Sequence, residues 1–170
     1  MDAGLYRLQG EAKVVASTHR TAVALGSNQG DRRAHLVYAV SRLRNLLSDL
    51  RVSPFLETEP ADVEPQPRFL NGVAVGQCEV EPAVLMAALL GIERARGRTR
   101  PHPGAPRTLD LDLILMGNLI VDNGHVHVPH PRFRLRRFVL EPLVAVDSEL
   151  VDPVSGCSMR ELLAALDASS

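Results

Sequence analysis

The sequence predicts an α+β fold of the ferredoxin-like class, a split βαβ sandwich with an antiparallel sheet, flanking helices and long loops that carry the site. Two observations lead to this prediction. Apolar and alternating segments follow the order strand, helix, strand, strand, helix, strand along residues 21–116. Proline-rich segments at 59–67 and 98–106 interrupt that order, and long irregular loops in a compact domain are usually functional. We expect the helices to cover one face of the sheet.

The first half of the chain supplies three predicted strands and one helix. TAVALGS at 21–27 is typical of a short buried strand that ends in a glycine turn. Asp31 is a candidate N-cap for a helix that runs to about Leu50 with an apolar stripe. A strand is expected near residues 51–58, and the alternation at 69–78 predicts another.

The second half supplies a helix, one more core strand and two final helices. Pro82 suits a first helical residue, and Gly97 is expected to stop that helix. Residues 109–116 form the last core strand, followed by a hairpin-like turn at Gly117. The last two helices are expected at residues 137–146 and 158–166.

Composition favours one compact soluble domain over residues 21–170, with residues 1–20 as a loose tail. The chain has 170 residues, 45% of them hydrophobic, which is enough for a real core. A net charge of −1 and the lack of a long apolar run predict neither a nucleic-acid nor a membrane partner. Two cysteines suggest no disulfide framework, so we expect a cytoplasmic protein. We also expect a monomer.

Two carboxylates stand on one face of the last core strand. Strand side chains alternate, so Asp110 and Asp112 point the same way, about 6.6 Å apart. A strand with one wet face would explain them, but Ile114 and Met116 continue that face and argue against full exposure. Partly buried like charges need compensation, and Mg²⁺ prefers carboxylate and phosphate oxygens. The pair therefore predicts a two-magnesium site for phosphoryl-group transfer.

An arginine-rich segment precedes those carboxylates. Arg98, Arg100 and Arg107 lie beyond the predicted helix, on a loop tethered beside the aspartates. Guanidinium groups bind phosphate oxygens in a bidentate manner, and phosphoryl transfer depends mainly on positioning and charge neutralisation. The basic run at 132–138, taken alone, is more typical of a surface patch. His125 and His127 share a strand face but lack a third ligand of matching spacing, which disfavours zinc.

Several motifs together resemble the 6-hydroxymethyl-7,8-dihydropterin pyrophosphokinase family of folate biosynthesis. The resemblance covers about residues 21–166. Its most specific parts are PRTLDLD, VPHPR and FVLEPL, whereas ALGSN alone would be weak. The motifs that carry it are ALGSN at 24–28, FLNGV at 69–73, IERARGRTR at 92–100, APRTLDLDLIL at 105–115, VPHPR at 128–132 and RRFVLEPL at 136–143.

The resemblance implies a Mg²⁺-dependent diphosphokinase that transfers the β,γ-pyrophosphoryl group of ATP to the pterin hydroxymethyl oxygen and releases AMP. It implies catalytic roles for Arg98 and Arg107 on the phosphates, and two magnesium ions on Asp110 and Asp112. The positions it assigns to the two substrates are Arg100, His130 and Arg136 for ATP, and Thr58, Phe69, Asn71 and Phe138 for the pterin, the two phenylalanines sandwiching its ring.

One stretch departs from the family pattern. Members often carry a tryptophan and a basic residue in the arginine loop where this chain has Gly104 and Pro103, so loop closure over ATP is expected to differ. Two other functions fit some of the residues. A different two-carboxylate, Mg²⁺-dependent nucleotidyl transferase shares the sheet, but the near-neutral charge opposes it. An inactive ferredoxin-like binding module would need a broken carboxylate face, yet both aspartates and Arg107 are present.

Overall fold

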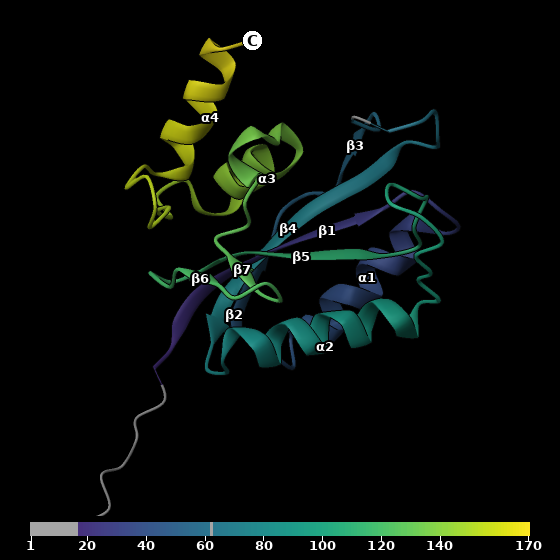
Figure 1. Ribbon diagram of the computed structural model, residues 1–170, viewed down its shortest axis with the longest axis horizontal. Helices are drawn as coiled ribbons and strands as arrows, with labels where there is room; N and C mark the ends of the chain where they lie inside the picture. Colours follow the sequence, from purple (N-terminus) through teal and green to yellow (C-terminus); the bar gives the residue numbers. More distant parts are fainter. Residues whose placement is uncertain (1–16, 62) are drawn as a thin grey trace, which may run out of the picture.

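A central antiparallel sheet organises the protein, as the computed structural model of residues 17–61 and 63–170 shows (Figure 1). The strand order is β2-β4-β1-β5. The short β3 pairs with the start of β4, whereas β2 pairs with the end of β4. The core strands are β1 (His19–Ser27), β2 (Ser48–Val52), β3 (Leu56–Thr58), β4 (Phe69–Cys78) and β5 (Asp110–Met116). This order, with every pairing antiparallel, confirms the predicted ferredoxin-like α+β class.

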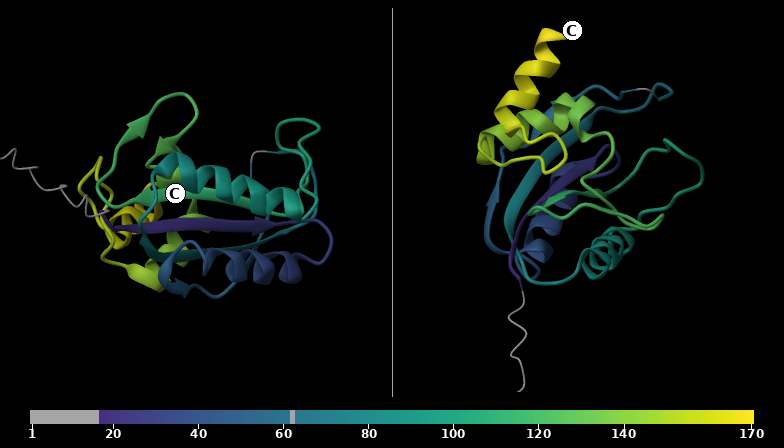
Figure 2. Two further views of the ribbon diagram at one scale, coloured as in Figure 1. Left: turned by 90° about the horizontal axis from the view of Figure 1, so that it is seen from below. Right: turned by 60° about the vertical axis from the view of Figure 1, so that its left-hand side comes forward.

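Helices cover both faces of this sheet, so the expectation of helices on one face was wrong. Below the sheet in Figure 1 lie α1 (Arg32–Leu43) and α2 (Pro82–Ala95), and above it lie α3 (Arg137–Asp147) and α4 (Met159–Ala168). Each pair packs on its own apolar cluster, and the views in Figure 2 separate the two layers. The cause is β4, which is buried along both faces rather than alternating.

The ends of several predicted elements differ from the observed ones. Helix α1 ends at Leu43, and a turn in which Leu47 N–H bonds the Leu43 carbonyl leads into β2. The strand expected at 51–58 is two strands, separated at Pro54, because proline cannot donate to a ladder. Strand β1 begins at His19, so the last part of the expected tail is strand; residues 1–16 of it lie outside the described residues.

The segment after β5 does not form the expected hairpin with it. Gly117 does turn the chain, with a positive φ of 55°, and Leu119 N–H bonds the Met116 carbonyl. The next strand, β6 (Val121–Asp122), pairs with β7 (His127–Val128) in a separate ribbon. A short 3₁₀ turn, Phe133–Leu135, then leads into α3. In the part of the chain that the structure describes, no helix combines the length and apolar character that a membrane span requires.

A β-bulge in β5 changes which layer its last apolar residues join. Ala22 of β1 is opposite Leu115 and Val23 is opposite Leu113, so Ile114 is the extra residue. Ile114 packs in the α3–α4 layer, on the face that carries the two aspartates, as the sequence predicted. Met116 packs instead in the α1–α2 layer, so its predicted place on the aspartate face was wrong. The bulge shifts the alternation by one residue.

A buried ion pair fixes the segment between α3 and α4. Asp152 is fully buried and accepts hydrogen bonds from Arg134 Nε at 2.6 Å and Nη2 at 2.8 Å. The Ser155 hydroxyl donates a further bond at 2.6 Å. Burial alone would raise the pKa of Asp152, but these donors hold that pKa down at about 2. The charged carboxylate therefore links the 3₁₀ turn before α3 to the segment between α3 and α4.

We predict that Asp152→Ala lowers the free energy of unfolding by about 3 kcal/mol, because it leaves Arg134 without its buried partner. Asp167→Ala, which removes an exposed partner of Arg137, should cost less than about 1 kcal/mol. Since the pKa of Asp152 is depressed, its contribution is full above its ordinary value of 3.8 and is lost as pH falls toward about 2. Urea unfolding at pH 7 and pH 3 measures both effects; equal losses in the two variants would contradict the assignment.

Candidate active site

The strand register places Asn71, a residue predicted for the pterin, and Asp110, a predicted metal ligand, side by side across β1. Gly26 of the central strand β1 is opposite Asn71 of β4 on one side and Asp110 of β5 on the other. A Cβ on Gly26 would lie 2.9 Å from Asn71 Oδ1 and 4.0 Å from Asp110 Cβ. The missing side chain therefore leaves a cradle between the two candidate groups. The turn that the sequence predicted at Gly26 was wrong, because Gly26 is a paired residue of β1, and its place between the two candidate groups was not predicted.

The two aspartates are surrounded by arginines from distant parts of the chain. Arg98 Nη1 lies 2.5 Å from Asp110 Oδ1, and Arg107 Nη1 lies 3.1 Å from its Oδ2. Arg136, just before α3, places Nη1 3.5 Å from Asp112 Oδ2. Burial, with the neighbouring charge of Asp110 as the next cause, raises the pKa of Asp112 to about 7. The Asp112 carboxylate is therefore held in a position that favours an added positive charge.

Glu93 is a site residue that the sequence reasoning missed. Its side chain is only 2% exposed, and its carboxylate accepts bonds from Arg98 at 3.3 Å, Arg100 at 2.9 Å and the Leu111 backbone N–H at 2.8 Å. Burial raises the pKa of Glu93. The available signal was its spacing: Glu93 follows Leu85 and Leu89 at intervals of four, so it falls on the buried stripe of α2.

The two proline-rich loops meet through Asn28. Asn28 Oδ1 accepts from Arg107 N at 2.8 Å, and its Nδ2 donates to Gln66 Oε1 at 2.7 Å. Gln66 Nε2 in turn donates to the Gly104 carbonyl at 3.1 Å. Gly104 has a φ of +75°, and a Cβ there would lie 3.2 Å from Val63 Cγ1. The departure from the family pattern at Gly104 thus falls where the two loops touch.

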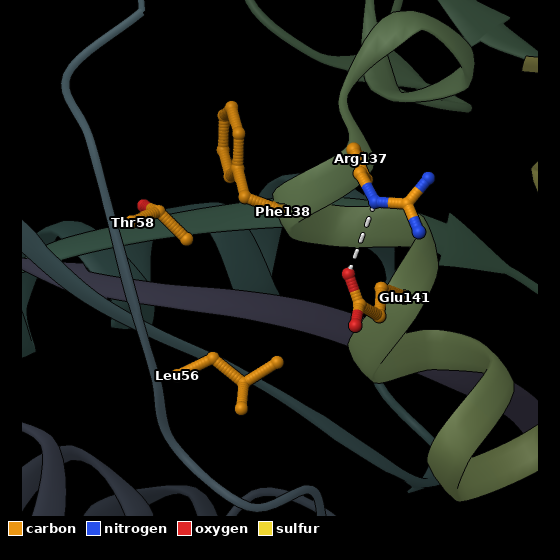
Figure 3. A pocket seen from close by; sticks show the side chains of 5 residues that line it. All are labelled: Leu56, Thr58, Arg137, Phe138 and Glu141. Carbon is orange, nitrogen blue, oxygen red and sulfur yellow. Dashed lines mark ion pairs between the residues drawn. The ribbon is translucent and has the colours of Figure 1, made fainter. Parts of the chain in front are cut away.

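Of the four residues predicted for the pterin, Thr58 and Phe138 line a common cavity, whereas Phe69 and Asn71 do not line it. Asn71 is 7% exposed, and its Nδ2 donates to Thr58 Oγ1 at 2.6 Å. Guanidinium carbons stand over both predicted aromatic rings, Arg107 at 5.4 Å from the Phe69 centroid and Arg136 at 5.6 Å from that of Phe138. A cavity of about 190 Å³ opens between β3 and the start of α3 (Figure 3), with these lining residues: Leu56, Thr58, Arg137, Phe138 and Glu141.

His130 and Arg100 lie at the edge of the arginine cluster. Burial, followed by the charges of Arg136 and Arg132, lowers the pKa of His130 to about 4, so its imidazole is neutral at pH 7. Its Nδ1 accepts from Arg132 N at 3.1 Å, which leaves the proton on Nε2 as a donor. Arg100 bonds Glu93 rather than either aspartate, and its side chain is 59% exposed. Of the two arginines predicted for ATP, Arg136 therefore pairs with the aspartates and Arg100 does not.

The donor set fits a hard divalent cation that arrives with phosphates. Asp110 and Asp112 supply carboxylate oxygens, and within the described residues no cluster of three or more His, Cys, Asp or Glu side chains is arranged to hold a metal. Mg²⁺ is commonly held by one or two carboxylates together with substrate phosphate oxygens and water. Arg98 Nε and Arg107 Nε are buried without a protein partner in the described part, which leaves donors for such phosphates. His125 and His127 lie on the exposed β6–β7 ribbon, and His127 pairs with Asp122.

Sequence comparison decides which family has this arrangement. The model of the 7,8-dihydro-6-hydroxymethylpterin-pyrophosphokinase (HPPK) family matches residues 22–148. The chain belongs to this family. A 2-amino-4-hydroxy-6-hydroxymethyldihydropteridine pyrophosphokinase from Pseudomonas aeruginosa is 39% identical over 148 residues, 86% of this chain and 91% of its own length. One of that name from Bacillus subtilis is 38% identical over 126 residues, 73% and 75% of the two chains.

Solved structures support the same fold at much lower identity. The crystal structure of wild-type Plasmodium falciparum HPPK-DHPS superposes with a TM-score of 0.68 and 12% identity, covering 88% of this chain. This chain spans 45% of that longer protein, and 26% of the mitochondrial folate synthesis bifunctional protein of Arabidopsis thaliana, to which it is 36% identical. Membership of the HPPK family makes the chain an enzyme, a pyrophosphokinase of folate synthesis, and it confirms the resemblance seen in the sequence motifs.

We predict that Glu93→Leu lowers the free energy of unfolding by about 3 kcal/mol, because Arg98 would stay buried with less compensation and the Leu111 N–H would lose its acceptor. Glu93→Gln keeps the side-chain volume and an acceptor oxygen, so its loss should be clearly smaller. Urea unfolding of the three proteins measures the difference. A leucine variant as stable as the wild type would refute the organising role of this carboxylate.

Proposed function

We propose that this HPPK family member transfers the β,γ-pyrophosphoryl group of ATP to the hydroxymethyl oxygen of 6-hydroxymethyl-7,8-dihydropterin, with two Mg²⁺ ions as cofactors. The observation that supports this most is the row Asn71–Gly26–Asp110, which joins a candidate pterin contact to a candidate metal ligand across one strand. In this reaction the pterin oxygen bonds to the β-phosphorus, the bond from that phosphorus to the α-phosphate oxygen breaks, and AMP leaves. The hydroxyl proton is released.

The chain's own groups suit the nucleotide half of that step. We assign Arg98 and Arg107 to the transferred phosphates, because both reach the carboxylate pair and keep a buried unpartnered Nε. Arg136 and the neutral His130, a donor through Nε2, are assigned to the α-phosphate, and Arg100 is assigned to the nucleotide at the exposed edge of the arginine cluster. Asp110 and Asp112 would hold the magnesium ions, which when bound neutralise the charge that builds up on the phosphate oxygens.

The pterin half rests on a polar edge and two rings. We assign Asn71, held by Thr58, to the amide edge of the heterocycle, where a buried side-chain amide can form directional hydrogen bonds. Phe69 and Phe138 are assigned to the two faces of the ring. We further propose that residues 21–170 act as a single pyrophosphokinase domain, as a monomer in the cytoplasm, with no nucleic-acid or membrane partner.

Product analysis tests the proposed reaction. We expect the wild-type protein with ATP, Mg²⁺ and the pterin alcohol to form AMP and a pterin diphosphate in equal amounts, as anion-exchange chromatography would measure. Asp112→Asn should lower kcat by about a hundredfold or more, since it removes one charge from the predicted metal pair. ADP as the nucleotide product, or an asparagine variant with wild-type kcat, would contradict the proposal.

Phe138→Leu separates the two substrates. The shorter, non-aromatic side chain should raise the KM for the pterin about tenfold and leave the KM for ATP within about twofold, because a ring face is lost only on the pterin side. Phe55→Leu is the matched control, since Phe55 is a half-buried ring under Arg33 outside the assigned site. A larger change in the ATP KM than in the pterin KM would overturn the role of Phe138.

A further inference from the structure

A cluster outside the assigned site holds the start of the arginine loop, residues 98–107. Arg96 follows the last residue of α2, and its Nε donates to His35 Nδ1 of α1 at 2.9 Å. The guanidinium carbon of Arg96 also stands 4.9 Å from the centroid of the Tyr38 ring, one turn further along α1. An imidazole acceptor and an aromatic face thus hold one guanidinium between the two helices. Arg96 lies within the IERARGRTR motif, but the resemblance gave it no role, and the proposed reaction does not use these contacts.

The same region of the chain anchors both ends of this loop. At its far end, Arg107 and Asn28 exchange two bonds, from Arg107 N to Asn28 Oδ1 at 2.8 Å and from Asn28 N to the Arg107 carbonyl at 3.1 Å. At its near end, Arg96 is fixed to α1 only two residues before Arg98. Between these anchors lie Arg98, which is assigned to the transferred phosphates, and the exposed Arg100. Gly97, with a φ of +72°, is the single residue between the anchor and Arg98.

We infer that Arg96, held by His35 and Tyr38, is a positioning group that fixes the exit of the arginine loop from α2 and so sets the place of Arg98 for the nucleotide. The inference rests on the proposed function, which supplies the nucleotide as the ligand of Arg98. It concerns residues that do not touch the substrates, so its effect passes through Arg98. The expected consequence is a change in nucleotide affinity without a matching change in pterin affinity, because the pterin residues Asn71 and Phe138 lie on β4 and α3.

The bond between Arg96 and His35 also depends on the protonation state of His35. Burial, and next the charge of Arg96, lower the pKa of His35, whereas Asp31 at the start of α1 acts in the opposite direction. His35 is therefore neutral at pH 7 and its Nδ1 is free to accept. Protonation at acid pH removes the acceptor and places a like charge beside Arg96. The anchor is intact above the lowered pKa of His35 and opens below it.

Calorimetric titration with a non-hydrolysable ATP analogue and Mg²⁺ tests the inference, and a separate titration with the pterin alcohol gives the comparison. Arg96→Met and Tyr38→Leu should each weaken binding of the analogue about tenfold and leave pterin binding within about twofold. Arg94→Met changes an exposed arginine of the same helical turn, and Tyr38→Phe keeps the ring face under the guanidinium. Both control variants should bind the analogue as the wild type does.

His35→Asn adds a readout that a purely structural role would not change. The amide oxygen can accept from Arg96 but does not titrate, so analogue binding by this variant should fall less between pH 7 and acid pH than that of the wild type. Wild-type analogue affinity in both Arg96→Met and Tyr38→Leu, or equal losses for analogue and pterin, would overturn the anchor. Because binding is measured without turnover, a wild type that forms no AMP counts against the proposed reaction and not against the anchor.

Discussion

Two carboxylates on one face of a buried strand impose the main electrostatic constraint on this protein. Asp110 and Asp112 cannot both stay charged beside each other without compensation, and burial makes the cost larger. The structure meets this cost with three arginines: Arg98 after α2, Arg107 three residues before β5 and Arg136 just before α3. Because the compensating groups are guanidiniums on loops or helix ends, the same groups suit a polyphosphate that carries its own cations.

The strand order also places the carboxylates relative to the residue proposed for the pterin. Only an order that places β1 between β4 and β5 sets Asn71 and Asp110 on either side of Gly26. The two proline-rich loops then gather at the same end of the sheet, where Asn28 and Gln66 join them (Figures 1 and 2). The residue proposed for the pterin and the residue proposed for the metal are therefore held by one sheet, and a hydrogen-bonded pair of loops lies at its end. This arrangement suits the alignment of a hydroxymethyl group with a phosphorus atom.

The sequence predicted local features of the candidate site but not the groups that support it. Alternation placed both aspartates on one face, and Pro82 marked the start of α2, because both signals are local. The spacing of Glu93 could have placed it on the buried stripe of α2, but its role as partner of Arg98 and Arg100 depends on contacts in space that the sequence does not give. The bulge at Ile114 and the second helical layer were missed for a similar reason. Both depend on which strands pair, and no short stretch of residues encodes that.

The central claim is that Asp110 and Asp112 hold divalent cations together with the nucleotide. Electron paramagnetic resonance of Mn²⁺, which substitutes for Mg²⁺, measures this directly in the presence of a non-hydrolysable ATP analogue. The wild-type protein should bind two Mn²⁺ ions per chain at saturating analogue, and the Asp110→Asn/Asp112→Asn double variant should lose at least one of them while still folding. Equal Mn²⁺ binding by the two proteins would contradict the claim.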